Sequence, residues 1–191
     1  MSYFPGLNEH DYRREVIEFN RLATEVGKNL DDMMRAMLFC VVLGDTEQQV
    51  EEMLQNPIIR WDSAALVPGG HTWKEHGLTN PLGADFSYPR DFFPMEWSRE
   101  DALKIVDQIT PDMVRKFKFC GTPEQVARMI QPFIEAGANH VMLGDYGSLV
   151  MAGDMGSAVD GSRRLAECFD HLRRLNGQQT LLEESMAPRR G

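Results

Sequence analysis

Residues 119–145 read FCGTPEQVARMIQPFIEAGANHVMLGD, and they predict a capped helix that leads directly into a strand. Thr122 is a good N-cap residue, Pro123 suits the first helical position, and Gln125 completes a capping box. Apolar residues then recur at helical spacing. Gly137 can adopt the left-handed conformation that closes a helix. The stretch therefore predicts a helix that begins after Thr122 and ends at the glycine.

The residues after that glycine predict a short buried strand over 139–143, which stops at a Gly-Asp pair. The same order occurs earlier in the chain, where a glycine precedes an apolar strand at 37–43 and a second Gly-Asp pair follows it. A helix, a glycine and a strand form the second half of a βαβ unit, and such units build parallel sheets. We therefore predict an α/β fold in which these are two successive strands of one parallel sheet.

The ends of the two predicted strands are candidate site positions, because binding sites in parallel α/β folds form at the carboxyl ends of the strands. This reasoning selects Leu43 and Gly44 at the end of the first strand, and Gly144, Asp145 and Tyr146 at the end of the second. The alternative is that the Gly-Asp pairs only turn the chain and cap the next helix.

Residues 56–97 interrupt the pattern, because they are rich in Pro, Gly and aromatic residues and show little periodicity. A connection of this length is often functional, so we predict an insertion, spanning about 56–118, that lies over a site. Trp73 and His76 in it are candidate ligand contacts, although its aromatic residues could equally fasten the insertion to the body. Arg115 and Lys116 could bind a phosphate or carboxylate, or form a solvated face.

The composition is that of a globular protein, with 191 residues, 42% hydrophobic and 26% charged, and a net charge of −9. This charge disfavours general binding to nucleic acid or anionic membranes. No apolar run approaches the roughly 20 residues of a membrane span, and the first residues do not resemble a signal peptide. We expect a cytoplasmic protein with reduced core cysteines at 40, 120 and 168. We expect no metal site, because His71 and His76 have no matching ligand pattern.

Four segments of the chain resemble the luciferase-like flavin and deazaflavin oxidoreductases. They are EVGKNLDDM (25–33), AMLFCVVLGDTEQQVEEM (36–53), WKEHGLTNPLGADFSYPRDFFP (73–94) and GTPEQVARMIQPFIEAGANHVML (121–143). The last is characteristic of the family. The third is most similar to the branch that holds deazaflavin-dependent ketoreductases and methylene-tetrahydromethanopterin reductases.

The resemblance implies a (β/α)8 TIM barrel of which this chain supplies only the carboxyl-terminal part. Strand 37–43 would be the seventh strand and strand 139–143 the eighth. Residues 1–175 would form this partial barrel domain, and 176–191 a flexible tail. Catalytic residues in the family lie on earlier segments, so the resemblance assigns none here. An incomplete barrel would leave an unpaired strand edge and an uncovered apolar face.

The function implied is hydride transfer between a reduced deazaflavin, coenzyme F-420, and a carbonyl or similar small molecule. Two alternatives remain open. One is an FMN-dependent luciferase-like monooxygenase. The other is a non-catalytic α/β protein that acts by dimerisation or by docking on a partner. We expect weak or absent cofactor binding and no activity from this chain alone, and association as a homodimer or through the open sheet edge.

Overall fold

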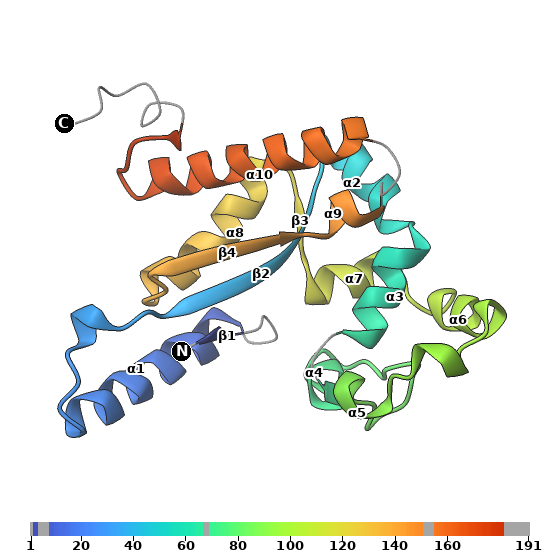
Figure 1. The fold of residues 1–191 in the computed structure, drawn as a ribbon, viewed down its shortest axis with the longest axis horizontal. Helices are drawn as coiled ribbons and strands as arrows, with labels where there is room; N and C mark the ends of the chain where they lie inside the picture. The colour runs from blue at the N-terminus through green and yellow to red at the C-terminus, as the bar shows by residue number, and fades with distance from the viewer. Residues whose placement is uncertain (1, 4–7, 67–68, 151–154, 182–191) are drawn as a thin grey trace.

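The computed structural model describes residues 2–3, 8–66, 69–150 and 155–181, and its centre is a parallel sheet (Figure 1). Every other strand in these ranges pairs in parallel with one long strand, β2. One partner, β4, lies along one side of β2, while two short strands, β1 and β3, lie at opposite ends of its other side. The strands are β1 (Ser2–Tyr3), β2 (Ala36–Leu43), β3 (Phe119–Gly121) and β4 (His140–Asp145).

Helices fill most of the remaining described chain. They are α1 (Glu9–Glu25), α2 (Glu47–Leu54), α3 (Pro57–Ala65), α4 (Gly69–Glu75), α5 (Tyr88–Asp91), α6 (Arg99–Val106), α7 (Pro111–Phe117), α8 (Pro123–Glu135), α9 (Tyr146–Val150) and α10 (Met155–Leu175), with short 3-10 turns η1 (Leu30–Asp32) and η2 (Pro94–Glu96). None of the described helices is long and apolar enough to cross a membrane.

The capping box predicted at the start of α8 is present. The Thr122 hydroxyl accepts the Gln125 backbone N–H at 3.4 Å, and the Gln125 side chain accepts the Thr122 N–H at 2.9 Å. The helix continues past Pro132 and ends before Gly137, whose φ is +117°. Such a φ favours glycine, because a Cβ is strained in the left-handed region. Local sequence signals therefore determine both ends of this helix.

Three βα units follow one another in the chain, and their helices all cover the same face of the sheet. These units are β1–α1, β2–α8 and β4–α10. One buried core joins α1, α8 and α10 to the same side of β2, through Met37, Phe39, Val41 and Leu43. Open doubly wound sheets carry helices on both faces, whereas a (β/α)8 barrel keeps its helices on the outside. The helix-covered side is therefore the outer face of a barrel segment.

The other side of the sheet, the inner face, is only partly covered in the described structure. Leu38 and Cys40 of β2 are half-buried there, and Met142 of β4 is 36% exposed. Leu38 and Met142 are paired across the two strands. Among the described strands β4 pairs only with β2, so its second edge is open. Both features match the expectation for an incomplete barrel.

Residues 56–97 contain helices that the sequence reading did not anticipate. Helices α3, α4 and α5 have nine, seven and four residues, so each is too short to display a clear helical period. Residues of α3 and α4 belong to a second core, in which Val42 of β2 and Cys120 of β3 meet residues of α2 and α7, whereas α5 has no buried residue. The insertion is thus a packed helical layer beside the carboxyl ends of the strands, on the right of Figure 1.

Two helices follow β4 in the described residues, and Gly161 lies inside the second of them. The chain forms α9 directly after β4, and α10 begins at Met155. Glycine serves close packing here, because a Cβ on Gly161 would lie 2.8 Å from the Ser148 Cβ and 3.1 Å from Asp145 Oδ2. A side chain at that position would push the two helices apart.

The predicted flexible tail, 176–191, begins after α10 ends. Thr180 is buried, and the Leu181 backbone N–H donates to Asp170 Oδ1 at 2.6 Å. Residues 182–191 lie outside the described residues, so the domain boundary stays a prediction.

Candidate functional site

The structure brings the two predicted strand ends together. Leu43 of β2 pairs with Gly121 of β3, and Val41 pairs with Asp145 of β4. The Gly44 N–H donates to the Gly121 carbonyl at 3.2 Å. A Cβ on Gly44 would lie 2.7 Å from a methyl group of Val50, so glycine is required for the tight turn into α2. These strand ends form one rim.

The side chains at this rim point in two directions. Leu43 is fully buried in the outer core. Asp145 also faces α9 and α10, because its Oδ1 accepts the Gly147 N–H at 2.9 Å and its Oδ2 lies near Gly161. Burial raises the pKa of the Asp145 carboxyl, and the hydrogen bond from the Gly147 N–H opposes this rise. Gly144 belongs to the inner face, where a Cβ would contact the Tyr146 ring at 3.7 Å. Only part of the predicted rim therefore faces the barrel interior.

A chain of buried polar groups runs from the insertion to the inner face. The Lys118 ammonium donates to Asp62 of α3 and lies 3.8 Å from the centroid of the Tyr146 ring. The Cys40 thiol donates to the Tyr146 hydroxyl at 3.7 Å. These contacts connect α3, the junction between α7 and β3, β2 and the start of α9, and they fix Tyr146 at the carboxyl end of β4.

The environment of Tyr146 keeps its hydroxyl protonated. Burial raises the pKa of Tyr146, and the nearby Asp62 carboxylate raises it further. Burial likewise raises the pKa of Asp62, against the opposing effect of Lys118. A protonated phenol is a hydrogen-bond donor, so the inner face holds one polar group able to donate to a ligand oxygen.

The sequence reading missed Asp62 and misjudged Cys40. Asp62 lies on the buried side of α3 with Ile59 and Ser63, and a carboxylate on that side is a signal of a buried partner. Cys40 is half-buried on the inner face and not a core thiol, whereas Cys120 and Cys168 are buried as expected.

A second charged group joins β2 to the final helix. Asp45, two residues after the end of β2, accepts hydrogen bonds from Arg163 at 2.6 Å and from Arg164 at 3.2 Å. Arg164 is 2% exposed, so this pair reaches into the packing between α10 and the rim. The hydrogen bond from Arg163 lowers the pKa of Asp45 below its ordinary value.

Replacing Arg163 by glutamine is expected to raise the pKa of Asp45, as followed by an NMR titration of its carboxyl group. A lowered carboxyl pKa adds stability above the unfolded-state pKa of about 3.9, and this stability is lost as pH falls through the folded value. Acid unfolding of the variant should therefore begin at a higher pH. Arg128→Gln, in an exposed pair with Glu124, is the control. An Asp45 that titrates identically in both proteins would contradict the assignment.

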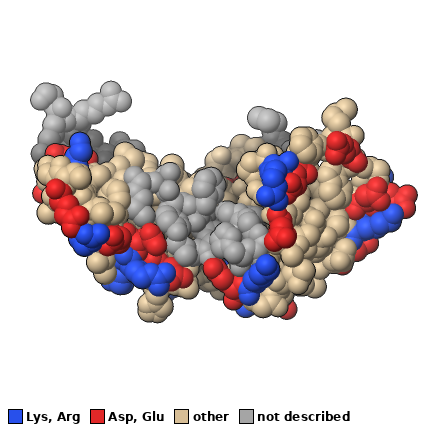
Figure 2. Space-filling model, turned by 90° about the horizontal axis from the view of Figure 1, so that it is seen from below, with Lys and Arg blue, Asp and Glu red and all other residues tan. Residues whose placement is uncertain are grey.

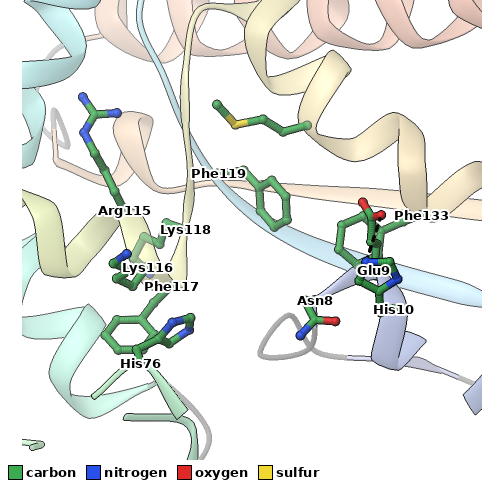
Figure 3. Close-up of a pocket in the computed structure, with 11 residues that line it drawn as sticks. Asn8, Glu9, His10, His76, Arg115, Lys116, Phe117, Lys118, Phe119 and Phe133 are labelled. Atoms are coloured by element: carbon green, nitrogen blue, oxygen red, sulfur yellow. Dashed lines mark ion pairs between the residues drawn. The ribbon is translucent and has the colours of Figure 1, made fainter. Parts of the chain in front are cut away.

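The other predicted contacts meet in a cavity of about 460 Å³ between α1, α7, β3 and α8 (Figure 3). His76, Arg115 and Lys116 lie along one wall, and Asn8 and His10 lie along the other. Phe119 and Phe133 form apolar surface between these walls. The cavity is therefore apolar inside and charged at its margin.

Trp73 lies behind this cavity, fully buried with its ring centroid 4.6 Å from that of Phe117. The Trp61 ring packs against those of Phe92 and Trp97, with ring centroids 6.0 and 5.2 Å away. These aromatic residues fasten the insertion together, which was the alternative to a ligand-binding wall. Within the described ranges, no three His, Cys, Asp or Glu side chains gather as metal ligands would.

One face of the molecule carries charged side chains of both signs (Figure 2). On the face shown in Figure 2, basic and acidic side chains of the described residues are mixed together and form no broad basic area. This distribution accords with the net negative charge of the sequence.

Comparison with known protein families gives a match that covers most of the chain. The family described as luciferase-like monooxygenase matches residues 1–140. The chain belongs to the luciferase-like monooxygenase family. Membership in this oxidoreductase family agrees with the parallel strands and one-sided helices, and it assigns them to part of a TIM barrel.

Several mycobacterial proteins are similar to this luciferase-like chain. The phthiodiolone/phenolphthiodiolone dimycocerosates ketoreductase of Mycobacterium tuberculosis is 27% identical over 140 residues, which cover 73% of this chain and 36% of that protein. The protein of the same name from Mycobacterium kansasii is 26% identical, with 73% and 37% covered. The luciferase-like chain thus matches little more than a third of the length of these curated relatives.

Among solved structures, the coenzyme F-420-dependent tetrahydromethanopterin reductase of Methanopyrus kandleri resembles this chain with a TM-score of 0.49 and 18% identity. The similarity covers 75% of this chain and 40% of that one.

Proposed function

We propose that this chain is the carboxyl-terminal part of a luciferase-like oxidoreductase in which a reduced deazaflavin, coenzyme F-420, reduces a carbonyl of a small molecule. The observation that supports this most is the partly open inner face at the end of β4, in a chain whose family uses flavin-type cofactors. The mycobacterial relatives are named ketoreductases, which favours a carbonyl as the reacting group.

The inner face suits one side of a flat ring. Leu38 and Met142 offer apolar surface, and Gly144 between β2 and the Tyr146 ring has no side chain to block an approach. These residues would hold the ring, and the deazaflavin would supply the hydride when bound. The described residues fit this role as one wall of a site, which the earlier strands of the barrel would complete.

Tyr146 is the residue of this chain that we assign to the carbonyl oxygen. Its hydroxyl is protonated at neutral pH and would donate a hydrogen bond to the oxygen. Lys118 and the insertion residue Asp62 hold the ring in place, so they act as positioning residues.

Two other functions remain as alternatives. The description of the matched family as a monooxygenase favours FMN and oxygen as the competing chemistry. The open edge of β4 favours a non-catalytic protein that dimerises or docks on a partner, since an unpaired strand can add another.

The test begins with the coding DNA upstream of Met1. We expect an in-frame extension that encodes the earlier βα units, and we expect the extended protein to bind coenzyme F-420 and to reduce a ketone.

In the extended protein, Gly144→Val should block cofactor binding by filling the inner face, whereas Ala158→Val, exposed on α10, should not. An extended protein that instead binds FMN and consumes oxygen would support the monooxygenase. A stop codon directly upstream of Met1 would contradict the partial-chain proposal.

A further inference from the structure

We propose that the cavity between α1, α7, β3 and α8 binds a small monocarboxylate with a flat apolar body. This inference does not depend on the proposed redox function, because the residues that would bind the carboxylate and its apolar body lie outside the inner face and only Lys118 is shared by the two sites. It concerns His76, Arg115 and Lys116, which the sequence singled out and the inner face does not use.

The size and the lining of the cavity favour a flat apolar body. Its volume of about 460 Å³ lies in the range of small-molecule sites. Its lining is mostly apolar and includes Phe117, Phe119, Phe133 and Met129. The rings of Phe119 and Phe133 are themselves fixed, with centroids 5.9 Å apart and both in contact with the buried Phe39. The apolar surface is therefore rigid and preformed.

The charges at the margin favour one carboxylate. Arg115 is paired with Glu51, and Lys118 is paired with Asp62, so these two cations already have partners. Lys116 is exposed at the same wall, and no ion pair to it is present among the described residues. The opposite wall carries the Glu9 carboxylate, which would repel a second anionic group. A ligand with a single carboxylate, directed at Lys116, matches this arrangement.

His76 strengthens this wall. Its ring lies edge-on to Phe117, with centroids 5.4 Å apart, and it lines the cavity beside Lys116. An imidazole N–H can donate to a carboxylate oxygen. The carboxylate would thus meet an ammonium group and a ring donor on one side, while its apolar body lies on the phenylalanine rings.

The experiment compares two probes of the same shape by titration calorimetry of the full 191-residue chain. We expect 2-naphthoate to bind about two- to fivefold more tightly than the neutral 2-naphthamide, since an exposed ion pair has an effect of this order. Lys116→Gln should remove the difference. Lys28→Gln is the matched control, because Lys28 follows the far end of the 17-residue α1, about 25 Å from the cavity.

A second variant tests the position of the charge independently of Lys116. Met129 is 46% exposed and lines the cavity, so Met129→Glu should fold normally. This variant should bind 2-naphthoate more weakly than Lys116→Gln does, and it should prefer the cation 2-naphthylmethylammonium. The proposal is overturned if neither 2-naphthoate nor 2-naphthamide binds saturably, or if these two probes bind equally to the unaltered chain. It is also overturned if Lys116→Gln and Met129→Glu both leave the ratio of the two affinities unchanged.

Discussion

Asp62→Asn is expected to lower the free energy of unfolding by about 3–5 kcal/mol, because it leaves the Lys118 ammonium buried without a carboxylate. The two residues are 8% and 6% exposed, so water cannot replace the lost partner. The intact pair contributes much less than this cost, since burial also disfavours both charges. The raised pKa of Asp62 reflects that penalty directly.

Urea unfolding followed by tryptophan fluorescence measures this loss. The double variant Asp62→Leu/Lys118→Met should recover most of the stability and lie within about 2 kcal/mol of the unaltered protein, because it removes both buried charges. Glu124→Gln, which breaks the exposed pair with Arg128, should cost less than about 1 kcal/mol. A double variant no more stable than Asp62→Asn would show that packing, and not the unpaired charge, causes the loss.

The sequence was sufficient where the signal for an element lies within a few residues of it. The helix predicted after Thr122 begins there as α8. The helices α2, α6 and α7 likewise follow Thr46, Ser98 and Thr110, and in all four the cap side chain accepts the backbone N–H three residues on. The strand predicted at 37–43 is β2, extended by one residue. Capping and periodicity are local properties, so they can be read without knowledge of the fold.

Contacts between distant parts of the chain were beyond this reasoning. Asp62 and Lys118 are 56 residues apart, and Asp45 and Arg164 are 119 apart. Nothing in the residues near either partner indicates the other. The fold class was predicted because two αβ modules share one pattern, but the barrel came from the family resemblance.

The direction of the rim side chains was also unpredictable, for a physical reason. The segment that forms β2, AMLFCVVL, is apolar at every position, so its alternation does not reveal which face is inward. Only the packing of α1, α8 and α10 shows that Leu43 points outward while Cys40 points toward the barrel interior. The candidate rim therefore contained both core residues and residues of the inner face.

Phe39→Ala is expected to lower the free energy of unfolding by about 3–5 kcal/mol, through lost burial and the cavity that remains. Phe39 is fully buried on the outer face of β2. Its ring meets Phe119 of β3 at 5.1 Å and Phe133 of α8 at 5.3 Å, so one side chain joins three elements. Removing it also frees the two rings that line the proposed carboxylate cavity.

The matched control is Phe93→Ala, since the same atoms are removed from a residue that is 54% exposed. It should change the stability by less than about 0.5 kcal/mol. Phe39→Leu should cost about 1–1.5 kcal/mol, because leucine fills much of the same space. If Phe39→Ala unfolds at the same urea concentration as Phe93→Ala, the outer core does not hold β2 to β3 and α8. If stability falls but 2-naphthoate still binds unchanged, Phe119 and Phe133 keep their places without the ring between them.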